Sequence, residues 1–199
     1  MKRKVIIMIF ITITIVLCGL YLHYENTKLQ VSNYKIVNNN IPVDFNNYKI
    51  VQISDFHNNQ SNTLTNDLIK EIEKQKPNII VLTGDFIDSN KTNVEVAMNF
   101  IKKINAVAPI YYVSGNHEAS VKSYTKIKEQ LAENKVVILE NKKEELKINE
   151  SSINLIGIDD PRMAHESFIS DKVSISWEIT TYGKLPMKSY SFLHFITGK

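Results

Sequence analysis

The sequence predicts an α/β fold in which parallel strands alternate with helices and a second sheet packs against the first. Apolar runs of strand length alternate with amphipathic helical segments between residues 48 and 134, the order that βαβ units produce. These runs are apolar at consecutive positions, which is typical of strands covered on both faces. A run of short strand-like segments follows and predicts the second sheet.

The predicted elements follow one another at regular intervals. Three strands are expected to lie parallel, with right-handed crossovers between them: "YKIVQIS" (48–54), "NIIVLTG" (78–84) and "PIYYVSG" (109–115). Helices are expected where apolar residues recur at helical spacing, over 63–75, 93–104 and 124–134. The later short strands are expected at 136–139, 144–148 and 153–158.

The N-terminus differs in composition from the rest of the chain. "MKRK" precedes 18 uncharged residues, Val5 to Leu22, a length at the lower limit for a membrane-spanning helix. We expect residues 1–23 to form a single-pass membrane anchor, with the following domain extracytoplasmic because the basic flank stays inside. A cleaved signal peptide is the alternative, although Tyr21 and His23 are poor residues for a small-residue cleavage site.

Two further regions follow the expected anchor. Residues 24–47 are polar and rich in asparagine, and we expect a linker with a first strand around Tyr34–Val37. Residues 48–199 are expected to form one domain. The three basic residues of "MKRK" account for the whole formal charge of +3, so the remainder is close to neutral and offers no nucleic-acid-binding patch. A single cysteine, Cys18, excludes an internal disulfide.

Polar side chains follow each of the three parallel strands. Asp55 and His57 follow the first, Gly84-Asp85 ends the second, and Gly115-Asn116-His117 ends the third. The spacing is 30 residues from Asp55 to Asp85 and 31 from Asp85 to Asn116, about the length of one βα unit. Because the carboxyl ends of parallel strands share one sheet edge, we expect these groups to converge there.

The donor types at this edge suit divalent cations. Two carboxylates, one imidazole and one amide oxygen come from Asp55, His57, Asp85 and Asn116. Adding an imidazole to oxygen ligands favours manganese, iron or zinc over calcium or magnesium. Two carboxylates packed together repel unless cations lie between them, so we expect two divalent metal ions. Such a pair can hold a bridging hydroxide and clamp a phosphoryl group, with His117 as a catalytic residue.

Each motif alone has a simpler explanation. Asp-x-His is commonly a cap or turn, Gly-Asp an Asx-turn, and Asn-His after glycine a plain turn. A phospho-acceptor receiver domain also places acidic residues at strand ends, but it gives no role to His57 or His117. The metal site is favoured because all three motifs occur in order, at matching strand ends and matching spacing.

The motifs "DFH" (55–57), "GDFID" (84–88), "GNHE" (115–118) and "LIGIDDP" (155–161) resemble the calcineurin-like metallophosphoesterase superfamily. The chain is most similar to its membrane-associated bacterial phosphodiesterases of the YaeI and YkuE type, over about residues 31–161. The resemblance implies a two-sheet α/β/β/α sandwich. It also implies that Asp55 and His57 bind one metal, Asp85 bridges both and Asn116 binds the second. His117 would act on the phosphate, whereas Asp88 and Glu118 would orient the ligands.

The resemblance stops before the C-terminus. The family's later metal-binding block, Gly-His-x-His, does not occur, and only His165 and His194 follow His117 among the histidines. We therefore expect an incomplete sandwich and a weakly bound second metal. The function expected is metal-dependent phosphoester hydrolysis, by a phosphodiesterase or phosphatase. The alternative is a membrane-anchored, non-catalytic remnant of such an enzyme. The substrate stays open among phosphomonoesters, phosphodiesters and lipid-linked pyrophosphates, and the anchor favours a lipid-linked one.

Overall fold

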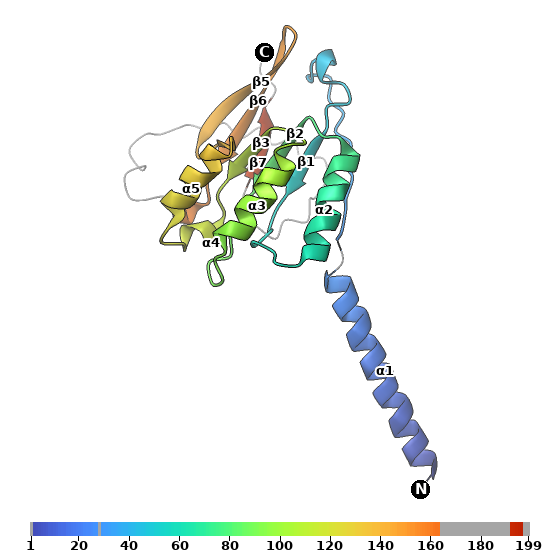
Figure 1. The fold of residues 1–199 in the computed structure, drawn as a ribbon. Coiled ribbons are helices and arrows are strands. Elements are labelled where there is room, and N and C mark those ends of the chain that lie inside the picture. The colour runs from blue at the N-terminus through green and yellow to red at the C-terminus, as the bar shows by residue number, and fades with distance from the viewer. Residues whose placement is uncertain (1, 28, 164–191, 197–199) are drawn as a thin grey trace.

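A computed structural model describes residues 2–27, 29–163 and 192–196 (Figure 1). Its first sheet contains four parallel strands in the order in which they occur along the chain. They are β1 (Ile50–Ile53), β2 (Ile79–Thr83), β3 (Ile110–Val113) and β4 (Val137–Ile138). The helices between them are α2 (Asn62–Gln75), α3 (Val94–Ile104) and α5 (Tyr124–Glu133). The predicted alternation of parallel strands and helices is confirmed.

The consecutive apolar residues of the strands serve two cores. On β2, Ile80 and Leu82 pack in the cluster shared with the helices, whereas Ile79 and Val81 pack in the cluster shared with the second sheet. All five residues of β2 are buried, because successive side chains of a strand point to opposite faces. Figure 1 shows α2, α3 and α5 side by side over one face of the first sheet.

The second sheet is antiparallel and lies on the other face. It contains β5 (Lys142–Ile148), β6 (Ser151–Ile158) and β7 (Phe192–Ile196), in that order. On β6, Ile153, Leu155 and Gly157 are buried at alternate positions. A Cβ on Gly157 would lie 2.1 Å from the Leu139 carbonyl oxygen, so this glycine permits the close approach of the two sheets. The described residues thus build three layers of the expected sandwich: helices, parallel sheet and second sheet.

Three details differ from the expectations. The strand expected at Tyr34–Val37 does not form: residues 29–38 have no regular structure and pair with neither sheet of the described chain. The short strand at 136–139 joins the first sheet as β4, because Tyr111 and Tyr112 of β3 pair with it. A four-residue helix, α4 (Asn116–Ala119), follows β3 at a place where no helix was expected.

The N-terminal residues form one long helix, α1 (Lys2–Thr27). Residues Arg3–Leu22 have a mean hydropathy of 2.8, and none of that stretch is buried against the domain. The helix is long and apolar enough to be a candidate membrane span, and a signal sequence would have the same properties. In Figure 1, α1 projects from the end of the domain at which the loops after β1, β2 and β3 lie.

Candidate metal centre

The loops that follow β1 and β2 are joined by backbone hydrogen bonds at the sheet edge. The amide of Asp55 donates to the carbonyl of Gly84 (3.2 Å), and the amide of His57 donates to the carbonyl of Asp85 (2.9 Å). These bonds continue the pairing of the two strands into irregular backbone. They place Asp55 and His57 next to Asp85, although 30 residues separate Asp55 from Asp85 in the sequence.

The backbone of these loops adopts an uncommon conformation. Four non-glycine residues at this edge have positive φ angles between 38° and 55°: Asp55, His57, Asn58 and Asp85. Asparagine, aspartate and histidine are enriched in this left-handed region, but each such residue still costs about 1–3 kcal/mol. Backbone strain of this kind clusters at functional sites, and it persists only where surrounding contacts hold the backbone in the strained conformation.

Asp85 is the most enclosed of the expected ligands, with 5% of its surface exposed. Its Oδ1 accepts a hydrogen bond from the backbone amide of His117, at 2.9 Å. A Cβ on Gly115 would lie 2.4 Å from both the amide nitrogen and the Oδ1 of Asp85. Glycine at this position therefore lets the loop after β3 approach the Asp85 carboxylate closely.

A fully buried carboxylate joins the loops after β2 and β3. Glu118 Oε2 accepts from the amides of Asp85 (2.9 Å) and Gly115 (2.8 Å), and its Oε1 accepts from the amide of Ile87 (2.9 Å). Burial raises the pKa of Glu118, and the backbone N–H donors oppose that shift by favouring the carboxylate. Glu118 is therefore occupied with backbone amides and positions Asp85, as the resemblance implied.

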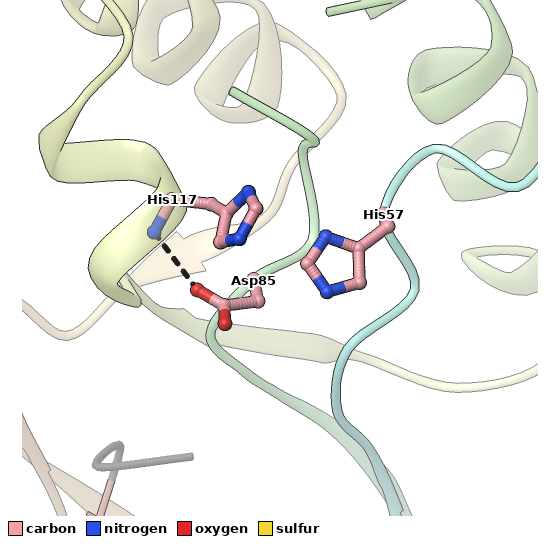
Figure 2. Close-up of side chains that lie close together, drawn as sticks. All are labelled: His57, Asp85 and His117. Carbon is pink, nitrogen blue, oxygen red and sulfur yellow. Dashed lines mark hydrogen bonds between the residues drawn. The ribbon is translucent and has the colours of Figure 1, made fainter. Parts of the chain in front are cut away.

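Two imidazoles flank the Asp85 carboxylate (Figure 2). One ligand-type atom each from His57, Asp85 and His117 lies within 4.8 Å of the others, and the two rings are 4.4 Å apart between centroids. Nδ1 of His57 is buried and has no hydrogen-bond partner among the described residues. Because a buried polar atom without a partner is costly, this nitrogen suits a ligand that the protein chain itself does not supply.

Asp55 extends the cluster toward solvent. Its Oδ1 lies 3.9 Å from Nε2 of His57, and 41% of its side chain is exposed. The hydroxyl of Ser54 donates to the other carboxylate oxygen. Asp55 therefore lies on the open side of the cluster, where a substrate could approach.

Hydrogen bonds define the orientation of the His117 ring. Its Nδ1 accepts from the backbone amide of Ser89 at 3.1 Å, so in the neutral ring the proton is on Nε2. Asp88 Oδ1 lies 3.9 Å from the same Nδ1. Backbone donors from Asn90 and Lys91 lower the pKa of Asp88, which keeps a negative charge beside the ring.

Asn116 lies next to the carboxylate from the first position of α4. With its amide nitrogen turned toward Asp85, it donates to Oδ2 at 3.2 Å and accepts from the amide of His117 at 3.3 Å. The opposite orientation presents the amide oxygen beside the carboxylate oxygen. Two oxygens placed side by side repel each other unless a cation lies between them. The Asn116 side chain can therefore donate a hydrogen bond to Asp85 in one orientation and offer its oxygen to a cation in the other.

The structure thus brings the expected site residues Asp55, His57, Asp85, Asn116 and His117 to one sheet edge. His194 lies on β7, paired with Ile156 of the second sheet, and His165 lies outside the described residues.

Sequence reasoning missed Asn58, which is 2% exposed. Its Oδ1 accepts from the amide of Asp88 at 2.7 Å and its Nδ2 donates to the carbonyl of Lys91 at 3.0 Å. Asn58 thereby holds the loop that carries Asp88 and Ser89 against the loop after β1. The only available signal was its position directly after His57, within the polar stretch "HNNQ".

The "GIDDP" segment also packs near the site. The Ser114 hydroxyl donates to Asp159 Oδ1 at 2.8 Å, and burial raises the pKa of Asp159 to about 6. Residues Pro161–Met163 contact α4, the helix that carries Asn116 and His117. This segment therefore supports the third strand end from the side of the second sheet.

A family profile described as "Calcineurin-like phosphoesterase" matches residues 48–189, more than half of the chain. The chain belongs to this family. The match includes the three strand-end motifs and the "GIDDP" segment, as the resemblance indicated.

Curated relatives support the same assignment. The uncharacterized metallophosphoesterase YkoQ of Bacillus subtilis (strain 168) is 30% identical over 115 residues, which cover 56% of this chain and 43% of YkoQ. A metallophosphoesterase of Aquifex aeolicus (strain VF5) is 32% identical over 107 residues, 52% of this chain and 40% of that protein. YkuE of Bacillus subtilis (strain 168) is 32% identical over 100 residues, 48% of this chain and 35% of YkuE. The matched region therefore covers less than half of each relative.

The family implies divalent metal ions, and the residues present fit them. The cluster contributes a buried carboxylate and two imidazoles, and Nδ1 of one of these, His57, has no hydrogen-bond partner among the described residues. This mixture of nitrogen and oxygen donors is typical of transition-metal sites.

We predict that Glu118→Gln destabilises the domain. Glutamine has the same shape, but its NH2 group turns a donor toward backbone amides that need an acceptor. The loss of a charge-assisted bond in a buried site should lower the free energy of unfolding by about 1–3 kcal/mol. Denaturant unfolding of the purified chain measures this change. Glu129→Gln, the same substitution on an exposed face of α5, is the control and should have no effect. Equal midpoints for the two variants would contradict the role assigned to Glu118.

Proposed function

We propose that this chain is the core of a metal-dependent phosphoester hydrolase that uses two divalent metal ions. The observation that carries the proposal is the cluster of His57, Asp85 and His117 at the carboxyl ends of three parallel strands, in a chain of the calcineurin-like phosphoesterase family. The hydrogen bond that the Asp85 amide donates to Glu118 holds the Asp85 backbone in place, which supports a ligand that must be positioned accurately.

The proposed ligands divide between the two ions. Asp55 and His57 would bind the first, Asn116 would bind the second, and Asp85 would bridge both. The position of Asp85 between the two histidines and beside Asn116 supports the bridging role. Manganese, iron and zinc are the ions that these nitrogen and oxygen donors favour.

When bound, the metal ions would lower the pKa of a water molecule and neutralise charge on the phosphoryl oxygens. The chain itself would stabilise the leaving oxygen. His117 holds its proton on Nε2 in the neutral ring, since Nδ1 accepts from Ser89, and we propose that Nε2 donates a hydrogen bond to the leaving oxygen. The Asp88 carboxylate lies 3.9 Å from Nδ1 of the same ring, so a negative charge stands beside the histidine.

We predict that the chain hydrolyses bis(p-nitrophenyl) phosphate when manganese is added, and that EDTA abolishes the activity. Asp85→Ala should lower the rate by at least about a hundredfold, because even residues that only support metal ligands contribute 10- to 100-fold. Release of p-nitrophenolate measures the rate, and elemental analysis counts the bound metal.

Asp67→Ala is the matched control, since Asp67 is exposed on α2 and forms a surface ion pair with Lys70 at 3.6 Å. Hydrolysis that survives EDTA, or that proceeds equally in Asp85→Ala, would contradict the proposal. Two bound ions without any turnover would indicate a metal-binding protein that is not an enzyme.

We propose further that α1 anchors the chain in the membrane and that residues 48–199 lie outside the cytoplasm. The apolar span and the basic residues before it support this placement, and it favours a lipid-linked phosphoester as substrate. Protease added to intact cells should then digest the domain. Digestion only after lysis would contradict the orientation.

A further inference from the structure

A cavity of about 320 Å³ lies beside the candidate metal centre. Its wall contains the end of β1, the first turns of α2, and the segment Leu29–Gln30 that follows α1. Five of its eleven lining residues are aliphatic or aromatic, and the other six are polar. The apolar ones are Leu29, Ile53, Phe56, Leu64 and Leu68. Asp55, a proposed metal ligand, belongs to the same wall, so the cavity and the proposed metal centre share this residue. Its volume is at the lower end of the range for small-molecule sites.

The cavity lies beside β1, which is at the edge of the first sheet among the described strands. No described strand of that sheet covers the outer side of β1. Leu64 and Leu68 are one turn apart on the same face of α2, and both are half-buried. Ile72, the next residue on that face, is only 2% exposed and packs in the core. The apolar face of α2 is thus covered at one end and open at the end near the metal centre.

The cavity also lies close to the expected membrane surface. The apolar span ends at Leu22, and α1 continues for five residues to Thr27, a length of about 8 Å. Leu29 is two residues farther along the chain, which adds at most about 7 Å. The wall of the cavity is therefore within about 15 Å of the end of the apolar span.

We infer that this cavity, which we name the β1–α2 cavity, binds a hydrocarbon chain of a membrane phospholipid while its phosphoester lies at the metal centre. The inference rests on the proposed function and on anchoring by α1. A water-soluble phosphoester would not need the apolar patch that these five side chains form in the same cavity as Asp55. A lipid in the same membrane can present a chain and a phosphoester together, and the short connection to α1 keeps the cavity near that lipid.

Photo-crosslinking in a bilayer tests occupancy without requiring turnover. The full chain, reconstituted in phosphatidylglycerol vesicles, carries p-benzoylphenylalanine in place of Leu64. Thr63, which is exposed on the same turn and absent from the cavity wall, is the control position. We expect a protein–lipid adduct by mass spectrometry from position 64 at least about fivefold above that from position 63. Equal yields, no adduct, or a protein–protein adduct from position 64 would overturn the inference, and the last result would indicate a second copy in the cavity.

A chain-length series tests the same cavity through catalysis. Methyl and octyl esters of p-nitrophenyl phosphate differ only in the apolar group, and each buried methylene favours binding. We expect kcat/KM for the octyl diester to exceed that for the methyl diester by at least about tenfold. Leu64→Asp should reduce this ratio toward one. The acidic residue is compatible with the first turn of α2, so the helix should still form.

Two further variants test the cavity assignment, and the crosslinking and kinetic results together distinguish its failure from the failure of the proposed function. Leu68→Gln, which nearly preserves volume, should also reduce the octyl-to-methyl ratio, whereas Thr63→Asp should preserve it. An unchanged ratio in both leucine variants would overturn the inference. If neither diester is hydrolysed but position 64 still captures lipid, the proposed function fails and the cavity assignment stands. If both diesters are hydrolysed equally and no lipid is captured, the cavity assignment fails and the proposed function stands.

Discussion

The buried carboxylate of Glu118 is the interaction on which the arrangement of the site depends. It accepts hydrogen bonds from three backbone amides that belong to the loops after β2 and β3. Those loops carry Asp85 and His117, and the strained φ of Asp85 requires contacts that hold it. A charged group with no exposed surface is costly unless its hydrogen bonds are satisfied, so the loops and the carboxylate stabilise one another.

Much of this architecture could be predicted from the sequence. The parallel strands were predictable because each is apolar on both faces and is followed by an amphipathic helix. The convergence of Asp55, Asp85 and Asn116 followed from the regular length of the βα units, since parallel strands end at one edge. The second sheet was predictable from the run of short strand-like segments after residue 135, although the first of them, at 136–139, joins the first sheet.

Other features depend on three-dimensional contacts that no local pattern contains. Asn58 and Ser89 act through hydrogen bonds to loops about 30 residues away, and nothing in their sequence neighbourhood specifies those partners. The strand expected at Tyr34–Val37 has the right composition, but strand formation requires a partner, and β1 pairs with β2 alone among the described strands. The edge position of β1, which leaves the β1–α2 cavity open, is likewise a property of the whole sheet.

The central claim is that the side chains around Asp85 bind metal, and anomalous diffraction from crystals soaked with zinc tests it most directly. Zinc bonds to imidazole nitrogen and carboxylate oxygen at about 2.0–2.2 Å. Our account predicts a zinc peak at that distance from both Asp85 and His57, with the amide oxygen of Asn116 turned toward the site. Zinc bound only elsewhere on the protein, with Asp85 contacting only His117 and Asn116, would contradict it.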